Sequence, residues 1–411
     1  MATTILVIFL IVYLGMILGG LPFLRLDRTG VALLGAIALI SIDALSLDQA
    51  VASIHLPTMA LLFAFMVVSA QMRLGGFYDW VTHKLAGLAL SPASLLAVLV
   101  AVSAALSAVF SNDIVCLAMA PLLVDACKRR GLAPVPFLLA LACASNIGSA
   151  ATLIGNPQNM LIGQTMRLSF DGYFLDAIVP VALGLVISWW LIVRQTKGRW
   201  EDAGDAAAGT PAPEQRAEQH AFDAWQTTKG LMVAGALLVA FLVAPWPREH
   251  MALIGAGVLL MSRQLHSRKM LGLVDWELLV LFMSLFVVNA ALQRTGLTGE
   301  AVAWMAAHGV QLDRPGSLFA ATFVLSNLVS NVPAVMLLMP AVHHPLGGVM
   351  LVLVSTLAGN LLIVGSIANI IVVDAAARQG IVIDWRRHAR VGVPVTVATL
   401  AISGMYLALR F

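Results

Sequence analysis

Long apolar runs separated by short polar segments dominate the chain. A helix needs about 20 apolar residues to cross a hydrocarbon core of about 30 Å, and bundles tolerate somewhat shorter helices whose ends are covered by neighbouring protein. The pattern therefore predicts membrane-spanning helices over residues 4–22, 30–44, 57–72, 172–193, 231–245, 250–262, 276–292 and 391–409.

Four further apolar runs contain polar residues near their middle. Residues 135–165 and 349–377 are long enough to cross but are interrupted by glycine and asparagine, with a proline in the first. Residues 93–127 and 316–342 each hold a Ser-Asn pair. We predict that the first two cross as broken helices and that the other two are re-entrant hairpins, which enter the bilayer and return to the same side.

The basic residues favour this topology. With the hairpins not crossing and the N-terminus outside, most of the 24 lysines and arginines lie in inner loops, as the positive-inside rule requires. The prediction is about ten crossings with both termini outside, in a multi-pass protein of the inner membrane. The outer side then holds only Arg167, Arg248, Arg294, Arg314 and Arg410.

Composition excludes several classes of protein. Of 411 residues, 60% are hydrophobic and only 11% are charged, against roughly a quarter in ordinary soluble domains. A net charge of +3 is too small to indicate nucleic acid as a partner. Cys116, Cys127 and Cys143 have the spacing of neither a disulfide framework nor a metal site. We therefore predict a protein of the lipid bilayer without a bound cofactor.

One polar segment divides the chain almost in half. Residues 196–228 are rich in charge, alanine, glycine and proline and show no apolar period. This composition is typical of a linker, which the topology places in the cytoplasm. The predicted organisation is a first repeat over residues 1–195, the linker, and a second repeat over residues 229–411.

The two halves share landmarks in the same order. Ser111-Asn112 in the first half matches Ser330-Asn331 in the second, and each pair is followed by a proline at the same spacing. Residues 153–159 match residues 363–369 at a slightly smaller offset. Five crossings per half is an odd number, so the second half would be inverted relative to the first. The predicted fold is an all-α polytopic membrane protein of two inverted repeats, each with five transmembrane helices, one hairpin and one broken helix, which is typical of secondary transporters.

Two segments resemble a known family. Residues 145–163 (SNIGSAATLIGNPQNMLIG) are similar to the broken-helix motif of the ion transporter superfamily, which includes divalent anion:sodium symporters, citrate transporters, arsenite efflux permeases and one class of sodium/proton antiporters. Residues 110–123 resemble the first hairpin tip of the arsenite permease branch. The dicarboxylate symporters have Ser-Asn-Thr at both tips, whereas the third residues here are Asp113 and Val332. The resemblance implies a homodimer and an elevator-type mechanism, in which a mobile unit carries the substrate past a fixed scaffold.

The interruptions supply a candidate binding site. Helix N-termini at membrane depth present free N–H groups suited to anions, and C-terminal ends present carbonyl groups suited to Na⁺. The alternative is that these small and polar residues only tighten helix packing. A Na⁺ site is expected near Asn112, Asp113 and Asn331. The predicted substrate and ion site draws on both tips and both breaks: Ser111, Asn112, Asp113, Asn146, Thr152, Gly155, Asn156, Asn159, Ser330, Asn331, Asn360, Gly365, Ser366 and Asn369.

Asp113 is the only acidic residue well inside a predicted hairpin. A carboxylate at that depth costs several kcal/mol unless it faces water, a cation or a hydrogen-bond donor. It could bind Na⁺ or carry a proton. The alternative is a capping residue for the second arm of its own hairpin.

These features predict a secondary transporter of a small anion, inorganic or carboxylate, coupled to Na⁺ or H⁺. Because no lysine or arginine lies in the apolar core, helix ends, amides and hydroxyls would hold the anion. One alternative is efflux of arsenite or antimonite, whose neutral hydroxide form needs no cationic pocket. Another is sodium/proton antiport. An intramembrane enzyme is disfavoured, because the chain has no catalytic motif at membrane depth.

Overall fold

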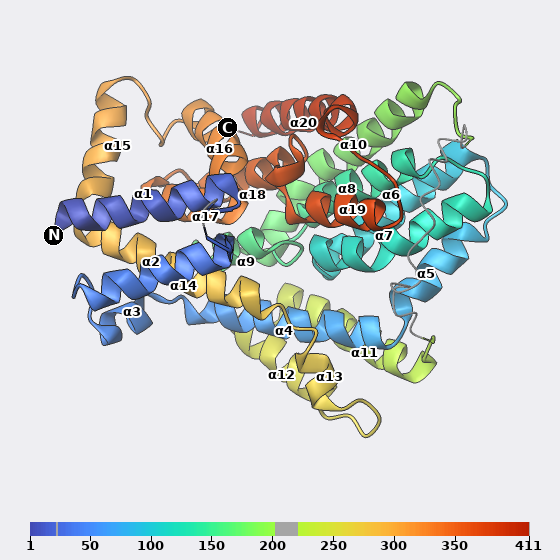
Figure 1. The fold of residues 1–411 in the computed structure, drawn as a ribbon, viewed down its shortest axis with the longest axis horizontal. Coiled ribbons are helices and arrows are strands. Elements are labelled where there is room, and N and C mark those ends of the chain that lie inside the picture. Colours follow the sequence, from blue (N-terminus) through green and yellow to red (C-terminus); the bar gives the residue numbers. More distant parts are fainter. Residues whose placement is uncertain (22–23, 202–220, 411) are drawn as a thin grey trace.

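The computed structural model describes residues 1–21, 24–201 and 221–410 (Figure 1). In that part of the chain it contains 20 α-helices, two 3-10 turns and one pair of short strands. The elements before residue 202 are α1 (Ala2–Leu18), β1 (Gly20–Leu21), β2 (Leu26–Asp27), α2 (Arg28–Ser41), α3 (Leu47–Ser53), α4 (Leu56–Leu74), α5 (Phe77–Ala86), α6 (Pro92–Val109), α7 (Asn112–Arg129), α8 (Pro134–Ser149), α9 (Pro157–Thr165) and α10 (Phe170–Thr196). Those after residue 220 are α11 (Ala224–Val243), α12 (Arg248–Leu260), α13 (Ser267–Leu271), α14 (Trp276–Arg294), α15 (Leu297–Ala307), α16 (Pro315–Val329), α17 (Asn331–Leu338), η1 (Met339–Ala341), α18 (Gly347–Ala358), η2 (Ile363–Gly365), α19 (Ile367–Arg378) and α20 (Trp385–Ala408).

Many of these helices have the composition of membrane spans. Within the described residues, α4, α6, α10, α11, α14 and α20 are long and apolar enough to cross a bilayer. Shorter apolar helices include α1, α2, α8, α16 and α18. Large apolar side chains such as Leu183 and Val186 of α10 are exposed, as expected for a surface that faces lipid. The chain is a multi-pass, predominantly helical membrane protein.

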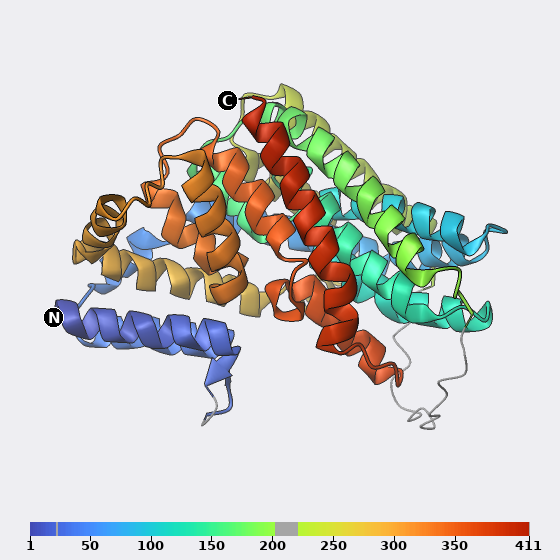
Figure 2. The same ribbon diagram turned by 90° about the horizontal axis from the view of Figure 1, so that it is seen from above.

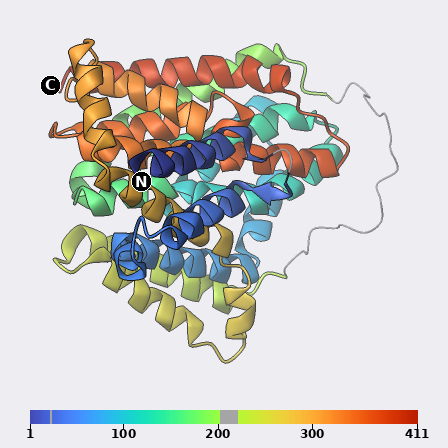
Figure 3. The same ribbon diagram turned by 60° about the vertical axis from the view of Figure 1, so that its left-hand side comes forward.

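The helices form two groups, which Figures 1 and 3 show as separate layers. In one group α2 packs against α14 and α4 packs against α12; we call α1–α4 and α11–α14 the outer group. In the other, α6 packs against α8, α16 against α18, and α10 against α20; we call α6–α10 and α16–α20 the inner group. Figure 2 shows α20 running beside α10. The connecting helices α5 and α15 lie at opposite ends of the molecule (Figure 1).

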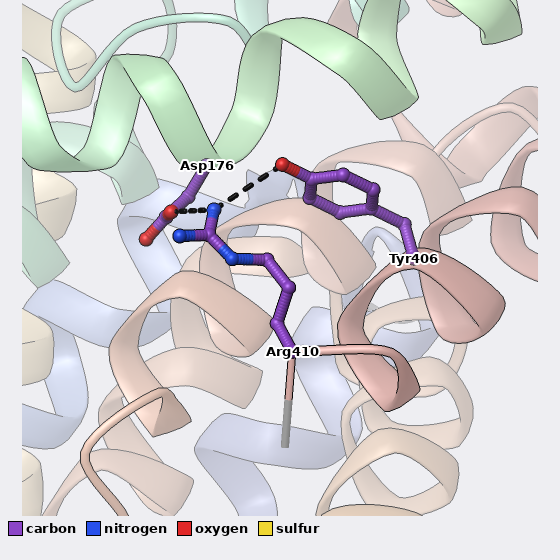
Figure 4. Close-up of polar contacts among 3 residues, drawn as sticks. All are labelled: Asp176, Tyr406 and Arg410. Carbon is purple, nitrogen blue, oxygen red and sulfur yellow. Dashed lines mark hydrogen bonds and ion pairs between the residues drawn. The ribbon is translucent and has the colours of Figure 1, made fainter.

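One end of the α10–α20 pair is fixed by polar contacts (Figure 4). The guanidinium of Arg410, just beyond α20, pairs with the carboxylate of Asp176 in α10. The same guanidinium donates a hydrogen bond of 3.2 Å to the Tyr406 hydroxyl. Because these groups are at or near the surface, we expect them to contribute modestly to stability.

The helix order after residue 220 repeats the order before it. His55 and Asp275 occupy equivalent positions and cap α4 and α14 by accepting a hydrogen bond from a backbone N–H, that of Thr58 and that of Leu278. Both helices are followed by a glycine with positive φ, 67° at Gly76 and 79° at Gly296. The contact of α2 with α14 has its counterpart in the contact of α12 with α4. In both contacts, the second helix of one half (α2 or α12) packs against the fourth helix of the other half (α14 or α4).

All four predicted interruptions are present. A two-residue turn at Phe110 and Ser111 separates α6 from α7, and Ser330 separates α16 from α17. Ser111 and Ser330 both have positive φ, 44° and 77°, which is a strained conformation for a residue with a side chain. Irregular backbone separates α8 from α9, and backbone containing η2 separates α18 from α19.

The structure departs from the predictions at some element boundaries. The fold is not purely helical, because β1 and β2 pair antiparallel between α1 and α2. Helix α20 begins at Trp385, earlier than the apolar run, since Asp384 caps it by accepting a hydrogen bond from the Arg387 N–H. Helix α11 likewise begins at Ala224, within the predicted linker, and residues 202–220 of that linker lie outside the described residues.

Candidate functional site

The break between α18 and α19 is held by one buried side chain. The Asn369 amide nitrogen donates hydrogen bonds to the carbonyl oxygens of Gly359, at 2.8 Å, and Leu362, at 3.0 Å. A helix interruption leaves carbonyl groups without helical partners, and burying them unpaired would cost free energy. Asn369 therefore satisfies the carbonyl groups that the break exposes.

The break between α8 and α9 is held in the same way. The Asn159 amide nitrogen donates to the carbonyl oxygens of Ser149, at 2.9 Å, and Thr152, at 3.1 Å. Asn156, which precedes α9, makes a longer contact of 3.5 Å to the Ser149 hydroxyl. The two breaks thus share one design, in which the asparagine and both of its carbonyl partners occupy equivalent positions in the two halves.

Glycine allows the first break to pack tightly against the first hairpin. A Cβ at Gly155 would lie 2.8 Å from the Ser107 carbonyl oxygen and would overlap the Ser149 carbonyl oxygen. At Gly365, the equivalent position, a Cβ would lie 3.1 Å from the Gly359 carbonyl oxygen. The backbone approach is therefore closer at the first break, where only glycine fits without movement.

The first hairpin tip is bonded to the first break. The Asn112 backbone N–H donates to the Gly155 carbonyl oxygen at 3.2 Å. The Thr152 hydroxyl donates to the Ala108 carbonyl oxygen at 2.5 Å. Both contacts use backbone groups near the tip, so the hairpin and the broken helix form one unit.

Asn146 connects the first tip to both breaks. Its amide oxygen accepts hydrogen bonds from the Asn112 amide nitrogen, at 2.9 Å, and from the Ser366 hydroxyl, at 2.8 Å. Its amide nitrogen donates to the amide oxygens of Asn360, at 2.9 Å, and Asn369, at 3.1 Å. All five side chains are buried. We call these five residues the amide cluster.

The network fixes the orientation of each amide in the cluster. Because the Asn369 amide nitrogen faces two carbonyl groups, its oxygen must face Asn146 and accept from the Asn146 nitrogen. The Asn146 oxygen then faces Asn112 and must accept from the Asn112 nitrogen. The Asn146 nitrogen also faces Asn360, so the Asn360 oxygen must be the acceptor of that bond. Two polar atoms then remain without a partner among the described residues: the Asn112 amide oxygen and the Asn360 amide nitrogen. A buried acceptor and a buried donor therefore flank Asn146, and each lacks the partner that a buried polar group normally has.

Asp113 lies beside a helix from the other half of the chain. It is in the first turn of α7, which packs against α19, and its partly buried carboxylate lies near the backbone of Ala368 in the first turn of α19. Ser366, the residue before α19, makes no side-chain capping bond. A carboxylate at a helix N-terminus is favoured by the helix dipole. Both predicted roles of Asp113, ion coupling and capping, stay predictions, and the structure adds that the N-terminus of α19 lies beside its carboxylate.

The second tip is not bonded to the amide cluster. Asn331 is buried and begins α17, which packs against α9, α14 and α18. Its amide oxygen has no hydrogen-bond partner among the described residues. The structure therefore brings Asn112, Asn146, Asn360, Ser366 and Asn369 together through hydrogen bonds, whereas Ser330 and Asn331 lie outside that network.

Several site neighbours were not predicted from the sequence. The Thr356 hydroxyl donates to the Asn159 amide oxygen at 2.9 Å, and Gln158 contacts Thr356 at 3.4 Å. The sequence offset that aligns Asn159 with Asn369 also aligns Asn146 with Thr356. This alignment was the sequence signal that could have identified Thr356 as a site neighbour. His388 is buried and places its Nε2 3.1 Å from the Asn360 carbonyl oxygen. His388 was not predicted as a site neighbour because it follows Arg386 and Arg387, and a run of basic residues is typical of a loop outside the membrane.

Among the described residues, the hydrogen bonds of the predicted site do not involve lysine or arginine. Within residues 1–21, 24–201 and 221–410, no lysine or arginine forms a hydrogen bond with a predicted site residue. The polar groups available are amides, hydroxyls, helix N-termini and one carboxylate. This set can bind a small hydroxylated molecule, a Na⁺ ion, or an anion held by helix dipoles.

Comparison with known proteins supports a transport role. The family model described as Citrate transporter (CitMHS) matches residues 5–350. Similar relatives include Silicon efflux transporter LSI3 of Oryza sativa subsp. japonica, 29% identical over 93% of this chain and 92% of that protein. A 46 kDa membrane protein of Mycobacterium leprae is 27% identical over 94% and 95%. Putative transporter arsB of Dictyostelium discoideum is 23% identical over 92% and 87%.

A solved structure has a similar fold. The YdaH transporter of Alcanivorax borkumensis aligns with a TM-score of 0.56 and 15% identity over 99% of this chain and 97% of that chain. The predicted resemblance to the ion transporter superfamily is confirmed, and the relatives' names point to a transporter rather than an enzyme. The chain belongs to the citrate transporter family, CitMHS, and is a multi-pass membrane transporter.

Proposed function

We propose that the protein is a secondary active transporter of a small oxyacid in its neutral, hydroxylated form. The observation that carries this proposal is the pair of unpartnered atoms in the amide cluster, the Asn112 oxygen and the Asn360 nitrogen. A molecule with O–H groups can donate to the first and accept from the second. A fully ionised anion has acceptors only and would leave the Asn112 oxygen unpaired, at a cost of about 1–3 kcal/mol.

The names of two relatives agree with this class of substrate. One is named for silicon efflux and another carries the name arsB. Arsenous and silicic acids are small and neutral near pH 7 and carry several hydroxyl groups. The proposed direction is therefore efflux, which was one of the alternatives drawn from the sequence.

Asp113 is the proposed coupling residue. It is the one carboxylate at the site, and it lies at the N-terminus of α19 beside the amide cluster. Exchange of a proton, or of Na⁺ bound with neighbouring carbonyl groups, would change the charge at this helix end. That change would link ion movement to the hydrogen bonds of Ser366 and Asn369.

The proposed mechanism is alternating access of the elevator type. Three observations support it. Asn159 and Asn369 make equivalent hydrogen bonds, and the contact of α2 with α14 is equivalent to that of α12 with α4. The connecting helices α5 and α15 lie at opposite ends of the molecule (Figure 1). This arrangement fits two inverted repeats with about ten crossings, in which the inner group moves past the outer group. A homodimer in the inner membrane with both termini outside completes the proposal.

The second candidate is symport of a small inorganic or carboxylate anion with Na⁺. The N-termini of α9 and α17 lack side-chain caps from the preceding residues, so N–H groups of their first turns are suited to an anion. The name of the matching family model, Citrate transporter, favours this candidate.

Counterflow in proteoliposomes distinguishes the candidates. Vesicles containing the full chain are loaded with arsenite, silicic acid or citrate, and entry of the same solute is followed by elemental analysis or radiolabel. The first candidate predicts exchange of arsenite or silicic acid above that of protein-free vesicles. Exchange of citrate alone, dependent on Na⁺, would favour the second. No exchange of any of the three solutes would contradict both.

A further inference from the structure

A ligand-sized space lies away from the amide cluster, between α5 and the C-terminal part of α7. It has a volume of about 240 Å³, and its opening is lined by polar residues, among them His83, Asp125, Arg129 and Arg130. A much smaller apolar recess, of about 20 Å³, adjoins it and shares Thr82, Ala86, Ala126 and Arg130 with it. The recess is lined further by Leu85, Leu95, Leu99, Leu123 and Phe137. The space thus combines a polar opening with an apolar interior.

The two arginines at the opening differ in how their side chains are held. The Arg130 guanidinium donates hydrogen bonds to the carbonyl oxygens of Ala86, Leu88 and Leu90, at 3.3, 2.9 and 3.0 Å. It is therefore fixed in the wall of the opening. Arg129 is exposed, and no hydrogen bond or ion pair joins its side chain to another described residue. Its guanidinium is free to bind an anionic group, with Asp125 offsetting only one of the two positive charges.

The position of α5 indicates the depth of this opening. Trp80 is 42% exposed, and the Lys84 ammonium lies 6.0 Å from the centre of its ring. Tryptophan beside a basic residue is typical of the boundary between bilayer and water. Because Thr82, Leu85 and Ala86 of the same helix line the space, its opening lies at the level of lipid head groups and its recess at the level of acyl chains.

We propose that this space binds an anionic phospholipid, with its phosphate at Arg129 and Arg130 and the first part of an acyl chain against the apolar side chains of the space, Leu122 and Ala126 among them. Basic pockets beside transmembrane helices attract anionic head groups. The apolar residues that line the space provide contacts that free phosphate cannot use, whereas a lipid tail gains free energy by covering them. The bound lipid would join α5 to α7, and so would stabilise the junction between the outer group and the first hairpin.

Lipid binding to the purified full chain tests this proposal. Native mass spectrometry would count adducts of phosphatidylglycerol and of phosphatidylcholine, and thermal unfolding would be followed with each lipid and with inorganic phosphate. We expect phosphatidylglycerol to bind and to raise the unfolding temperature, with no effect of the other two.

Two variants and a control make the test specific. Arg129→Gln should weaken phosphatidylglycerol binding about fivefold, the effect of removing one basic residue near an anionic head group. Ala126→Trp, which fills the space, should abolish binding. Arg263→Gln, an exposed arginine elsewhere, should bind as the unmodified chain does. Equal binding of phosphatidylcholine, an equal response to phosphate, or unchanged binding in both variants would overturn the proposal.

Discussion

Asn159 and Asn369 occupy equivalent positions in the two halves and make the same two hydrogen bonds, each to a pair of carbonyl groups exposed by a helix break. The equivalence extends to their oxygens, because Asn159 accepts from Thr356 and Asn369 accepts from Asn146, itself the equivalent of Thr356. Each break is therefore held by bonds within its own half, while the bond that each amide oxygen accepts comes from the other half.

Replacing either of these asparagines should destabilise the protein to a similar extent. Asn159→Ala removes the donor to the carbonyl groups of Ser149 and Thr152, and Asn369→Ala removes the donor to those of Gly359 and Leu362. Leu362 keeps a bond from the Gly365 N–H, so the two variants should each lower the free energy of unfolding by about 1–3 kcal/mol, with Asn159→Ala at least as costly. Thermal unfolding in detergent measures the effect. Asn156→Ala, which removes a single contact of 3.5 Å, is the matched control and should cost less. A neutral effect of Asn159→Ala would show that this bond pattern does not hold the break.

Asn146 should be the most sensitive position of the amide cluster. Asn146→Ala removes four hydrogen bonds and leaves the amide groups of Asn112, Asn360 and Asn369 without their shared partner. We expect loss of transport and a lower unfolding temperature than in Asn112→Ala, which removes one bond between side chains. An unfolding temperature equal to that of Asn112→Ala would contradict the role of Asn146 as the connecting residue.

The two break glycines should differ in their tolerance of alanine. Gly155→Ala places a methyl group against backbone oxygens of Ser149 and Ser107, whereas the equivalent contact in Gly365→Ala is 3.1 Å and can relax. We expect Gly155→Ala to cost about 1–3 kcal/mol through overpacking and Gly365→Ala to cost less. Gly257→Ala, with open space around its Cβ, is the control. The reverse order of stabilities would be inconsistent with this geometry.

Asp113→Asn should remove ion coupling and preserve the fold. Asparagine keeps the size of the side chain and an acceptor oxygen beside the α19 N-terminus, but it neither releases a proton nor supplies a negative charge for Na⁺. Transport in proteoliposomes should lose its dependence on imposed pH or Na⁺ gradients. Asp374→Asn, at an exposed salt bridge with Arg378, is the control. If Asp113→Asn kept the full gradient dependence, the residue would be a cap alone.

The sequence predicted the interruptions but not their partners. The tips are marked in the sequence by Ser-Asn pairs and the first break by Gly155 and Pro157, because these residues interrupt apolar runs. Each of these signals lies within a single segment of the chain. The bonds from Asn146 to Asn360 and Asn369 join residues from opposite halves of the chain. Spacing within one segment carries no information about such contacts, which depend on how the halves pack.

Helix ends and buried polar neighbours were also hidden from the sequence pattern. Asp384 caps α20 ahead of its apolar run, so hydrophobicity alone placed the start too late. His388 follows Arg386 and Arg387, which made it resemble a loop residue, although it contacts the Asn360 carbonyl group. In both cases a polar group near a helix N-terminus is accommodated by tertiary structure that hydropathy does not describe.

The most direct test of the central claim is solute flux through Asn112→Ala and Asn331→Ala in proteoliposomes, with thermal unfolding used to confirm that each variant is folded. Both residues begin the second arm of a hairpin and carry a buried amide oxygen without a partner among the described residues. The control is Ser403→Ala in α20, whose buried hydroxyl also lacks such a partner but lies outside the predicted site. We predict that both asparagine variants fold and that their flux falls to the level of protein-free vesicles, while the control transports normally. Flux equal to that of the unmodified chain in either folded variant would contradict a substrate site formed by the hairpin tips.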